Sequence, residues 1–236
     1  MHFLRKVFLF VFFLLSCFVR PLERSSIFAT PGIGEVSGVH ACKELFLDMN
    51  LEGTVNWKAF SQAVEGYNRI TDRKREVLTL IDFSKPSTEK RLYVFDMKEH
   101  KLLYASLVSH GRNSGGNHAT SFSNENGSYK SSLGFYLTES TYQGRNGYSL
   151  ILDGLEKGIN DHSRERAIVV HGAAYANPSV ISGGGRLGRS LGCPALPQEL
   201  ARPIIDAIKG GSVMYIYADK TEYTSKSAIL NRKNIL

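Results

Sequence analysis

Seven short segments between residues 77 and 218, rich in β-branched and aromatic residues, constrain the fold more than any other feature. Their apolar positions tend to recur every second residue, which is typical of strands that bury one face. Clusters of Gly, Pro, Asn and Ser separate the segments and predict turns. The expected strands cover residues 77–83, 91–96, 102–108, 133–138, 148–152, 167–171 and 212–218. The pattern therefore predicts a mainly β (α+β) domain.

Apolar residues at helical spacing flank and interrupt this β-rich region. They predict two short helices before it, over 40–50 and 57–67, and Asn56 is well placed to cap the second. A third helix is expected over 197–209, stopped by Gly210-Gly211. The two early helices are expected to pack on the β-rich domain.

The first 29 residues differ in character from the rest. Arg5 and Lys6 precede an apolar stretch of 13 residues, 7–19, which is too short to span a bilayer comfortably. A basic start and a short apolar core are typical of a secretory signal, so we expect export to the periplasm or cell envelope. Two processing sites stay open, cleavage after Ala29 or lipoprotein-type processing that leaves a lipid anchor on Cys17. The remaining chain then divides into a helical segment (30–75), the main domain (76–220) and a loose basic tail (221–236), with no integral membrane domain.

The charge balance bears on possible partners. The formal net charge of +7 falls to +4 without residues 1–29, because four basic residues and one acidic residue leave with them. A modestly basic exported domain suits an anionic polymer or a membrane surface. Its Lys and Arg residues are scattered rather than gathered into a stripe, so nucleic acid is not an expected partner. Metal-ligand spacing and a phosphate-binding loop are both missing from the sequence, and no cofactor is expected.

Two long connections, 109–132 and 172–196, hold little predicted secondary structure. Connections of this length in a compact domain are often where binding or catalysis occurs. The second contains Cys193, in a glycine-rich turn. Cys42, by contrast, lies in the first predicted helix, where a buried and inert thiol is expected. A Cys42–Cys193 disulfide in an oxidising compartment stays open as an alternative.

His171 and Cys193 lie near the two ends of the second connection. His171 ends an apolar predicted strand, where a side chain is held rigidly and is half exposed, and Cys193 follows 22 residues later. A neutral imidazole beside a thiol takes its proton and produces a strong nucleophile. Gly192 lets backbone N–H groups approach a developing oxyanion. On spacing alone, a purely structural role for both residues stays open.

The same residues resemble the L,D-transpeptidase catalytic domain family, in its divergent murein branch. His171-Gly172 follows a strand, and Ser190-Leu191-Gly192-Cys193 comes about twenty residues later. The resemblance covers most of residues 40–218. The other segments that carry it are residues 81–87, 109–115, 121–124, 127–128, 131–136, 153–156 and 188–195.

The resemblance implies a fold, a substrate and a mechanism. The fold is a β-sandwich or barrel with the Cys and His facing one cleft, and the partners are peptidoglycan stem peptides. Cys193 attacks the bond between meso-diaminopimelate and D-alanine in a tetrapeptide stem, and the thioester then passes to an amine of a second stem. His171 serves as base and then as acid. Gly172 is implied to orient His171 through its backbone, and Ser190 and Gly192 to shape the site.

The sequence departs from the family pattern beside the nucleophile. Mainstream members place an arginine two residues after the cysteine, and this chain has Ala195 there. Arg186 and Arg189 lie nearby and are candidates to bind a substrate carboxylate. Their alternative role is that of ordinary solvated charges in a loop.

The first long connection supplies two more candidate substrate contacts. His110 is one, with a structural hydrogen bond to the loop as its alternative role. Asn113 is the other, with a turn as its alternative role.

Three functions remain in view. The first is a transpeptidase that cross-links or remodels stem peptides. The second is an L,D-carboxypeptidase or amidase that gives the same thioester to water. The third is a non-catalytic module that binds the cell wall. The acceptor, the oligomeric state and sensitivity to carbapenems, which acylate the nucleophile in this superfamily, are left open by the sequence.

Overall fold

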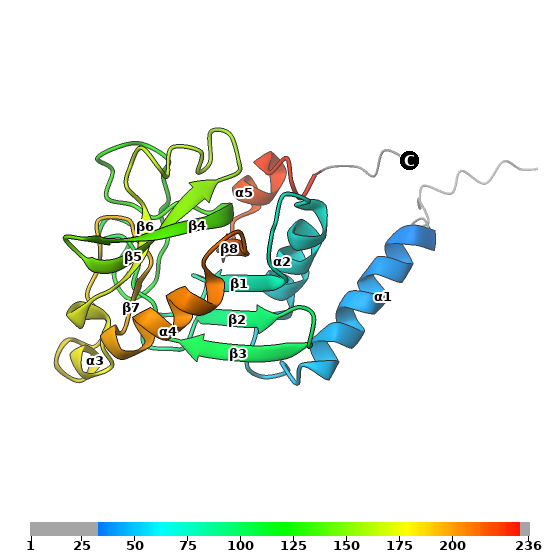
Figure 1. Ribbon diagram of the computed structural model, residues 1–236, viewed down its shortest axis with the longest axis horizontal. Helices are drawn as coiled ribbons and strands as arrows, with labels where there is room; N and C mark the ends of the chain where they lie inside the picture. The colour runs from blue at the N-terminus through cyan, green and yellow to red at the C-terminus, as the bar shows by residue number, and fades with distance from the viewer. Residues whose placement is uncertain (1–32, 232–236) are drawn as a thin grey trace, which may run out of the picture.

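The computed structural model describes residues 33–231, and its centre is an eight-stranded mixed sheet that curves into a nearly closed barrel (Figure 1). The spatial order of the strands is β3-β2-β1-β8-β4-β5-β6-β7. The prediction of a mainly β chain with a few helices is therefore confirmed. The strands are β1 (Val77–Asp82), β2 (Leu92–Asp96), β3 (Lys101–Ser106), β4 (Gly134–Gly144), β5 (Gly147–Gly154), β6 (Val169–Gly172), β7 (Ala195–Leu196) and β8 (Val213–Tyr217).

The centre of the sheet is formed by β1 and β8, which run parallel, with Leu80 paired to Tyr215. Every residue of both strands is buried. A strand covered on both faces needs apolar side chains on both, which explains why these two segments read as nearly continuous apolar runs. β2 and β4 pair antiparallel on the outer sides of β1 and β8.

The two edges of the sheet meet through the chain that follows β3. Ser109 and Ala195 form an isolated antiparallel bridge, in which the Ser109 N–H donates to the Ala195 carbonyl at 2.8 Å. Ala195 belongs to β7, the opposite edge strand, and β7 is itself paired in parallel with β6. The bridge nearly closes the barrel and removes most of the open edge that a sheet otherwise exposes. It also fixes the position of the chain immediately after Cys193.

The hairpin of β4 and β5 is longer than the alternation of residues predicts. Its turn lies at Arg145-Asn146, as expected, but pairing extends along both arms to Gly144 and Gly147. The outer arm of β4 carries mostly exposed side chains. Because that part faces solvent on both sides, its sequence lacks the apolar alternation from which strands are predicted.

Within residues 33–231, six helical segments surround the sheet, and two of them were predicted closely. They are α1 (Ile33–Asp48), α2 (Trp57–Arg69), η1 (Ala174–Ala176), α3 (Ser179–Gly184), α4 (Gln198–Ile208) and α5 (Thr221–Lys226). The Asn56 side chain caps α2 by accepting the Lys58 N–H at 2.9 Å, as predicted. α2 packs on β1 and β8, and α4 packs on β6, the strand that carries His171. α1 packs against α2 at one end of the molecule (Figure 1).

The expected loose tail after residue 220 is wrong for the described part of that segment. α5 buries Tyr223, whose hydroxyl donates to Glu156 at 2.9 Å. The hydroxyl of Ser227, just beyond the helix, also donates to Glu156. A buried carboxylate requires such donors, and the polar tail residues supply them. The tail was misread because its polar side chains look solvated in the sequence.

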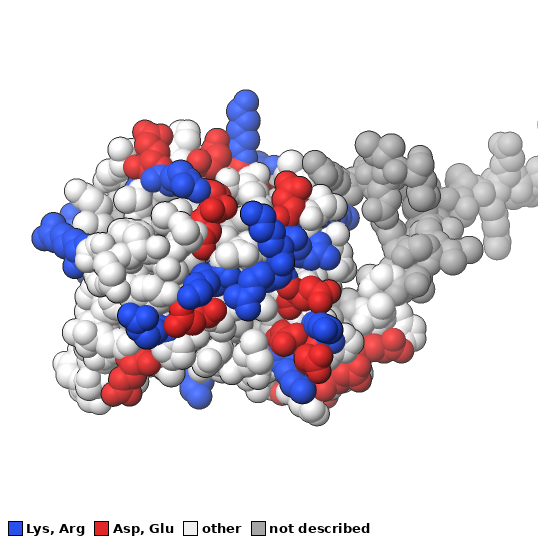
Figure 2. Space-filling view, viewed as in Figure 1, with Lys and Arg blue, Asp and Glu red and all other residues white. Residues whose placement is uncertain are grey.

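The surface carries both signs of charge. Figure 2 shows Lys and Arg side chains interspersed with Asp and Glu on the face viewed in Figure 1. Between residues 33 and 231, no helix combines the length and apolar character needed to cross a membrane. The expected secretory signal, its processing sites and Cys17 lie outside the described residues.

Candidate active site

Cys193 and His171 are brought together by the pairing of β6 with β7. His171 is the register partner of Ala195, two residues after the cysteine. Two residues earlier on each strand segment, Cys193 lies opposite Val169, and the Val169 N–H donates to the Cys193 Sγ at 3.5 Å. Val169 and His171 are two residues apart on one strand and therefore share a face of it. The sheet register thus places the thiol and the imidazole on the same side of β6.

The thiol of Cys193 is buried among backbone groups, with 9% of the residue exposed. Its Sγ donates to the Ala167 carbonyl at 3.6 Å. Burial raises the pKa of this thiol, while the Val169 N–H and the Arg166 guanidinium oppose that rise. The resting group is therefore a protonated thiol that sits beside two stabilisers of its anion.

The imidazole of His171 is held by its neighbour in the chain. Nδ1 lies 3.0 Å from the carbonyl oxygen of Gly172, so Nδ1 carries the proton and donates it. The lone pair is then on Nε2. Burial lowers the pKa of His171, and the hydrogen bond to Gly172 partly offsets this. A neutral imidazole with a free lone pair is the form that accepts a proton from a thiol.

Both side chains line one cavity of about 420 Å³. A volume of this size is in the range of small-molecule and peptide sites. The remaining wall comes from the β4–β5 turn, the segment before β6, η1 and the Cys193 loop. These lining residues are Arg145, Asn146, Arg166, Ala167, Ile168, Tyr175, Arg189, Ser190 and Leu191.

A tight turn built by Ser190 presents the cysteine. The Ser190 hydroxyl donates to the Cys193 carbonyl at 2.6 Å and accepts the Gly192 N–H at 3.0 Å. Gly192 has φ of +131°, in the region that favours glycine. A Cβ there would lie 2.9 Å from Ile168 and 3.0 Å from the Lys130 carbonyl. Glycine is therefore required at this position both for conformation and for space.

The serine-rich connection 109–132 supports this turn from the other side. Ser131 donates its hydroxyl proton to the Gly192 carbonyl at 3.0 Å and accepts the Gly111 N–H at 3.0 Å. The Ser190 N–H donates to the His110 carbonyl at 2.9 Å. The two long connections are thus joined to each other, and the first one serves chiefly as a scaffold for the Cys193 loop.

Three residues expected to bind substrate lie outside the cavity. His110 is buried, with Nδ1 2.8 Å from Arg91 Nη2. Asn113 donates from its side chain to the Ser128 carbonyl at 2.9 Å, and Arg186 donates to the Leu187 carbonyl at 2.7 Å. The cleft assignment is wrong for all three, because Asn113 and Arg186 bond to backbone carbonyls of their own connections, and His110 bonds to the buried Arg91. Arg189 does line the cavity.

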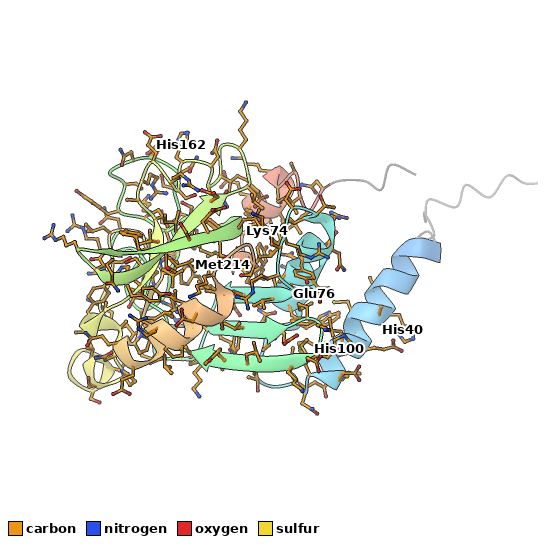
Figure 3. All side chains as sticks on the ribbon, in the orientation of Figure 1. His40, Lys74, Glu76, His100, His162 and Met214 are labelled. Carbon is orange, nitrogen blue, oxygen red and sulfur yellow. The ribbon has the colours of Figure 1, made fainter. Side chains whose placement is uncertain are left out.

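The other described histidines lie away from the thiol. His40, His100 and His162 sit at the periphery of the molecule (Figure 3), and all three are exposed, as is His118. Within residues 33–231, no group of three or more His, Cys, Asp and Glu side chains is placed to hold a metal ion.

Four cavity residues were missed by sequence reasoning. Arg145 and Asn146 were read only as turn residues, and Arg166 and Tyr175 were not singled out. The cavity wall is contributed by loops that meet only in the folded barrel, so no local pattern marks these residues. A weak signal existed for Arg166, which immediately precedes the strand that carries His171.

A match to a family model shows which protein family the chain belongs to. The model of the L,D-transpeptidase catalytic domain matches residues 51–217, a span that includes β1 to β8, His171 and Cys193. The chain belongs to this family. The L,D-transpeptidase match begins at Leu51, inside the segment expected to precede the main domain, and so includes α2.

Solved L,D-transpeptidases also resemble the chain in structure, at low identity. One from Mycobacterium smegmatis has a TM-score of 0.39 and 14% identity, over 61% of this chain and 59% of that one. One from Mycobacterium tuberculosis has a TM-score of 0.39 and 15% identity, over 60% and 57%. This chain thus spans less than two thirds of their length. A search of curated proteins found no match.

Proposed function

We propose that the chain is a peptidoglycan L,D-transpeptidase that works through a thioester on Cys193, with His171 as its base. The observation that carries the proposal is that these two side chains, inside the family match, line the same cavity. The proposed donor is a tetrapeptide stem ending in D-alanine, and the proposed acceptor is an amine of a second stem.

In the first proposed step, Sγ of Cys193 bonds to the carbonyl carbon that precedes D-alanine. Nε2 of His171 takes the thiol proton as the attack occurs, since both groups start neutral. The carbon–nitrogen bond to D-alanine then breaks, and Nε2 gives the same proton to the departing amine. The enzyme is left as a thioester, and free D-alanine is released.

In the second proposed step, the acceptor amine bonds to the thioester carbon. Nε2 of His171 accepts a proton from that amine and returns it to sulfur as the carbon–sulfur bond breaks. Water in place of the amine gives a shortened stem, which is the carboxypeptidase outcome. The hydrogen bond from Nδ1 to Gly172 keeps Nε2 aimed at the cavity in both steps.

Stabilisation of the oxyanion falls to the Cys193 N–H rather than to that of Gly192. The Gly192 N–H is already donated to Ser190. The Cys193 N–H donates no backbone hydrogen bond in the described part of the chain. An N–H of the nucleophile itself lies next to the carbon under attack, and one such donor typically contributes about 10²–10³-fold to the rate.

The proposal is tested by incubating the purified protein with disaccharide-tetrapeptides. We expect release of D-alanine together with cross-linked dimers, and an acyl-enzyme adduct on Cys193 by mass spectrometry. Cys193→Ala is expected to abolish both products, whereas the matched variant Cys42→Ala retains them. Tripeptides without dimers would show a carboxypeptidase, and no D-alanine release by the wild-type protein would contradict the proposal.

We also propose that the chain is exported to the cell envelope. Support comes from the basic start and the short apolar stretch at residues 7–19. A C-terminal fusion to a reporter that is active only outside the cytoplasm is expected to give signal from the full chain. The same fusion lacking residues 1–29 is expected to give none, and equal signal from both would contradict export by this segment.

A further inference from the structure

Arg166 enters the Cys193 cavity from the turn that precedes β6. The next residue, Ala167, has φ of +52°, a left-handed conformation that is uncommon for a residue other than glycine. This turn presents the Ala167 carbonyl to the Cys193 Sγ at 3.6 Å. Non-glycine residues held in such conformations concentrate at functional sites, where the surrounding structure maintains them. Arg166 and Ala167 thus belong to the wall around the nucleophile.

The guanidinium of Arg166 is held by neutral acceptors from the connection 109–132. Nη1 donates to the Ser123 carbonyl at 2.8 Å and to the Ser132 hydroxyl at 2.6 Å. Nη2 donates to the Lys130 carbonyl at 2.6 Å and to the Ser128 hydroxyl at 3.3 Å. Each terminal nitrogen has two protons, so all four are used. A guanidinium bound in this way is a fixed charge, and its terminal N–H groups are not free to bind substrate.

No acid neutralises this charge in the described part of the chain, since none of the ion pairs there includes Arg166. Arg164, two residues earlier, is the contrasting case, because it pairs with Asp153 in a two-pronged contact on the surface. The ionisable groups that line the cavity with Cys193 are His171, Tyr175, Arg145, Arg166 and Arg189, and they include no carboxylate.

The guanidinium of Arg166 lies beside Gly192, the residue that precedes Cys193. A Cβ on Gly192 would lie 3.5 Å from Arg166 Nη2 and 3.0 Å from the Lys130 carbonyl that Arg166 binds. The guanidinium therefore packs against the residue immediately before the cysteine. The electrostatic contact runs both ways, because Arg166 favours the Cys193 thiolate and the thiolate favours the charged form of Arg166.

We propose that Arg166 is a positioning residue with two effects, holding the serine-rich connection against the Cys193 turn and supplying the fixed positive charge that stabilises the Cys193 thiolate. The inference rests on the proposed function of Cys193 as nucleophile. Burial of the thiol opposes its ionisation, and an uncompensated cation held beside Gly192 in the wall of the same cavity offsets part of that cost. Serine and carbonyl acceptors suit this role, because a carboxylate in their place would cancel the charge.

The test measures alkylation of Cys193 by iodoacetamide between pH 5 and 10, without substrate, with peptide mapping to separate Cys193 from Cys42. Arg166→Met removes the charge and is expected to move the pH midpoint of alkylation upward and to slow the rate at pH 7 about tenfold. Arg166→Lys keeps the charge and is expected to restore most of the rate. Arg164→Gln, which removes an arginine outside the cavity, is expected to leave the profile unchanged.

A second variant separates the electrostatic effect of Arg166 from its role in holding the serine-rich connection in place. Ser132→Ala removes one acceptor of Arg166 but no charge, so its thermal midpoint is expected to fall while the alkylation midpoint stays in place. An unchanged alkylation midpoint in Arg166→Met overturns the inference, and equal losses in Arg166→Met and Arg166→Lys overturn the charge effect. If Arg166→Met does not fold, Arg166→Gln, which also removes the charge but keeps hydrogen-bond donors, replaces it in the same comparison with Arg166→Lys. Wild-type Cys193 that reacts no faster than an ordinary exposed thiol contradicts the proposed function instead.

Discussion

Two histidines near the Cys193 turn, His110 and His171, each have an arginine nearby, but the fold uses the two imidazoles differently. At His110, the Arg91 guanidinium bonds directly to the imidazole, and both side chains are buried. At His171, the nearby Arg166 bonds to serines and carbonyls instead, and the imidazole faces a cavity.

The direction of each hydrogen bond explains the difference. Arg91 has only donors, so Nδ1 of His110 must accept and has no lone pair left to offer. His171 donates from Nδ1 to Gly172 and keeps the lone pair of Nε2 for chemistry. A buried histidine is therefore reactive or inert according to which of its nitrogens the fold has used.

The largest effect expected from this contrast is on activity. His171→Ala is expected to reduce release of D-alanine by about 10³-fold or more, because the thiol loses the group that accepts its proton. His110→Ala is expected to stay within a few-fold of wild type per folded molecule. The measurement is initial rate at saturating tetrapeptide, normalised to the folded fraction by circular dichroism. Equal losses of activity in His171→Ala and His110→Ala would contradict the proposed difference between the two histidines.

The next effect concerns stability and pH. Burial and the charge of Arg91 lower the pKa of His110 from 6.5 to about 4. Above pH 6.5 the imidazole is neutral in both the folded and unfolded chains. Below that value the unfolded chain binds a proton that the folded chain refuses, so stability is lost as pH falls toward 4.

His110→Gln is expected to lose less stability over this range than wild type, by about 3 kcal/mol at most, because glutamine does not titrate. Urea unfolding at pH 7 and at pH 4.5 measures the difference. Asp82, on the strand next to Arg91, is common to both proteins and cancels in the comparison, as do the other carboxylates. Parallel pH profiles for the two proteins would show that folding does not change the pKa of His110 and would contradict this prediction.

The sequence predicted that His171 and Cys193 share one cavity, and it predicted the rest of that cavity less well. Seven of the strands and the helices α1, α2 and α4 followed from local periodicity, whereas β7, η1, α3 and α5 did not. His171 and Cys193 were singled out because each stands at a strand end or a glycine-rich turn. His110 was misassigned, since its partner Arg91 lies 19 residues earlier, immediately before β2, and no local pattern reveals that contact. Arg166 was missed for the same reason, because its acceptors lie about 40 residues away along the chain.

The smallest expected effect extends the contrast from imidazoles to thiols. Cys42 is a buried residue of α1, and burial together with the negative charge of Glu65 raises the pKa of its thiol to about 11. Unlike Cys193, it has no backbone N–H or arginine beside it to favour the anion. Both thiols are free in the structure, so the disulfide between Cys42 and Cys193 that the sequence left open is not formed there.

Cys42→Ala is therefore expected to cost about 1 kcal/mol of stability and to leave turnover unchanged. Alkylation of the wild-type protein at pH 8 is expected to modify Cys193 first and Cys42 only as the chain unfolds. Mass spectrometry of timed samples measures both rates in one experiment, with urea as the control that equalises them. Cys42 and Cys193 are about equally buried, at 8% and 9% exposed, so exposure does not distinguish them. Faster modification of Cys42 than of Cys193 in the folded protein would mean that hydrogen bonds and charge around sulfur do not govern thiol reactivity here.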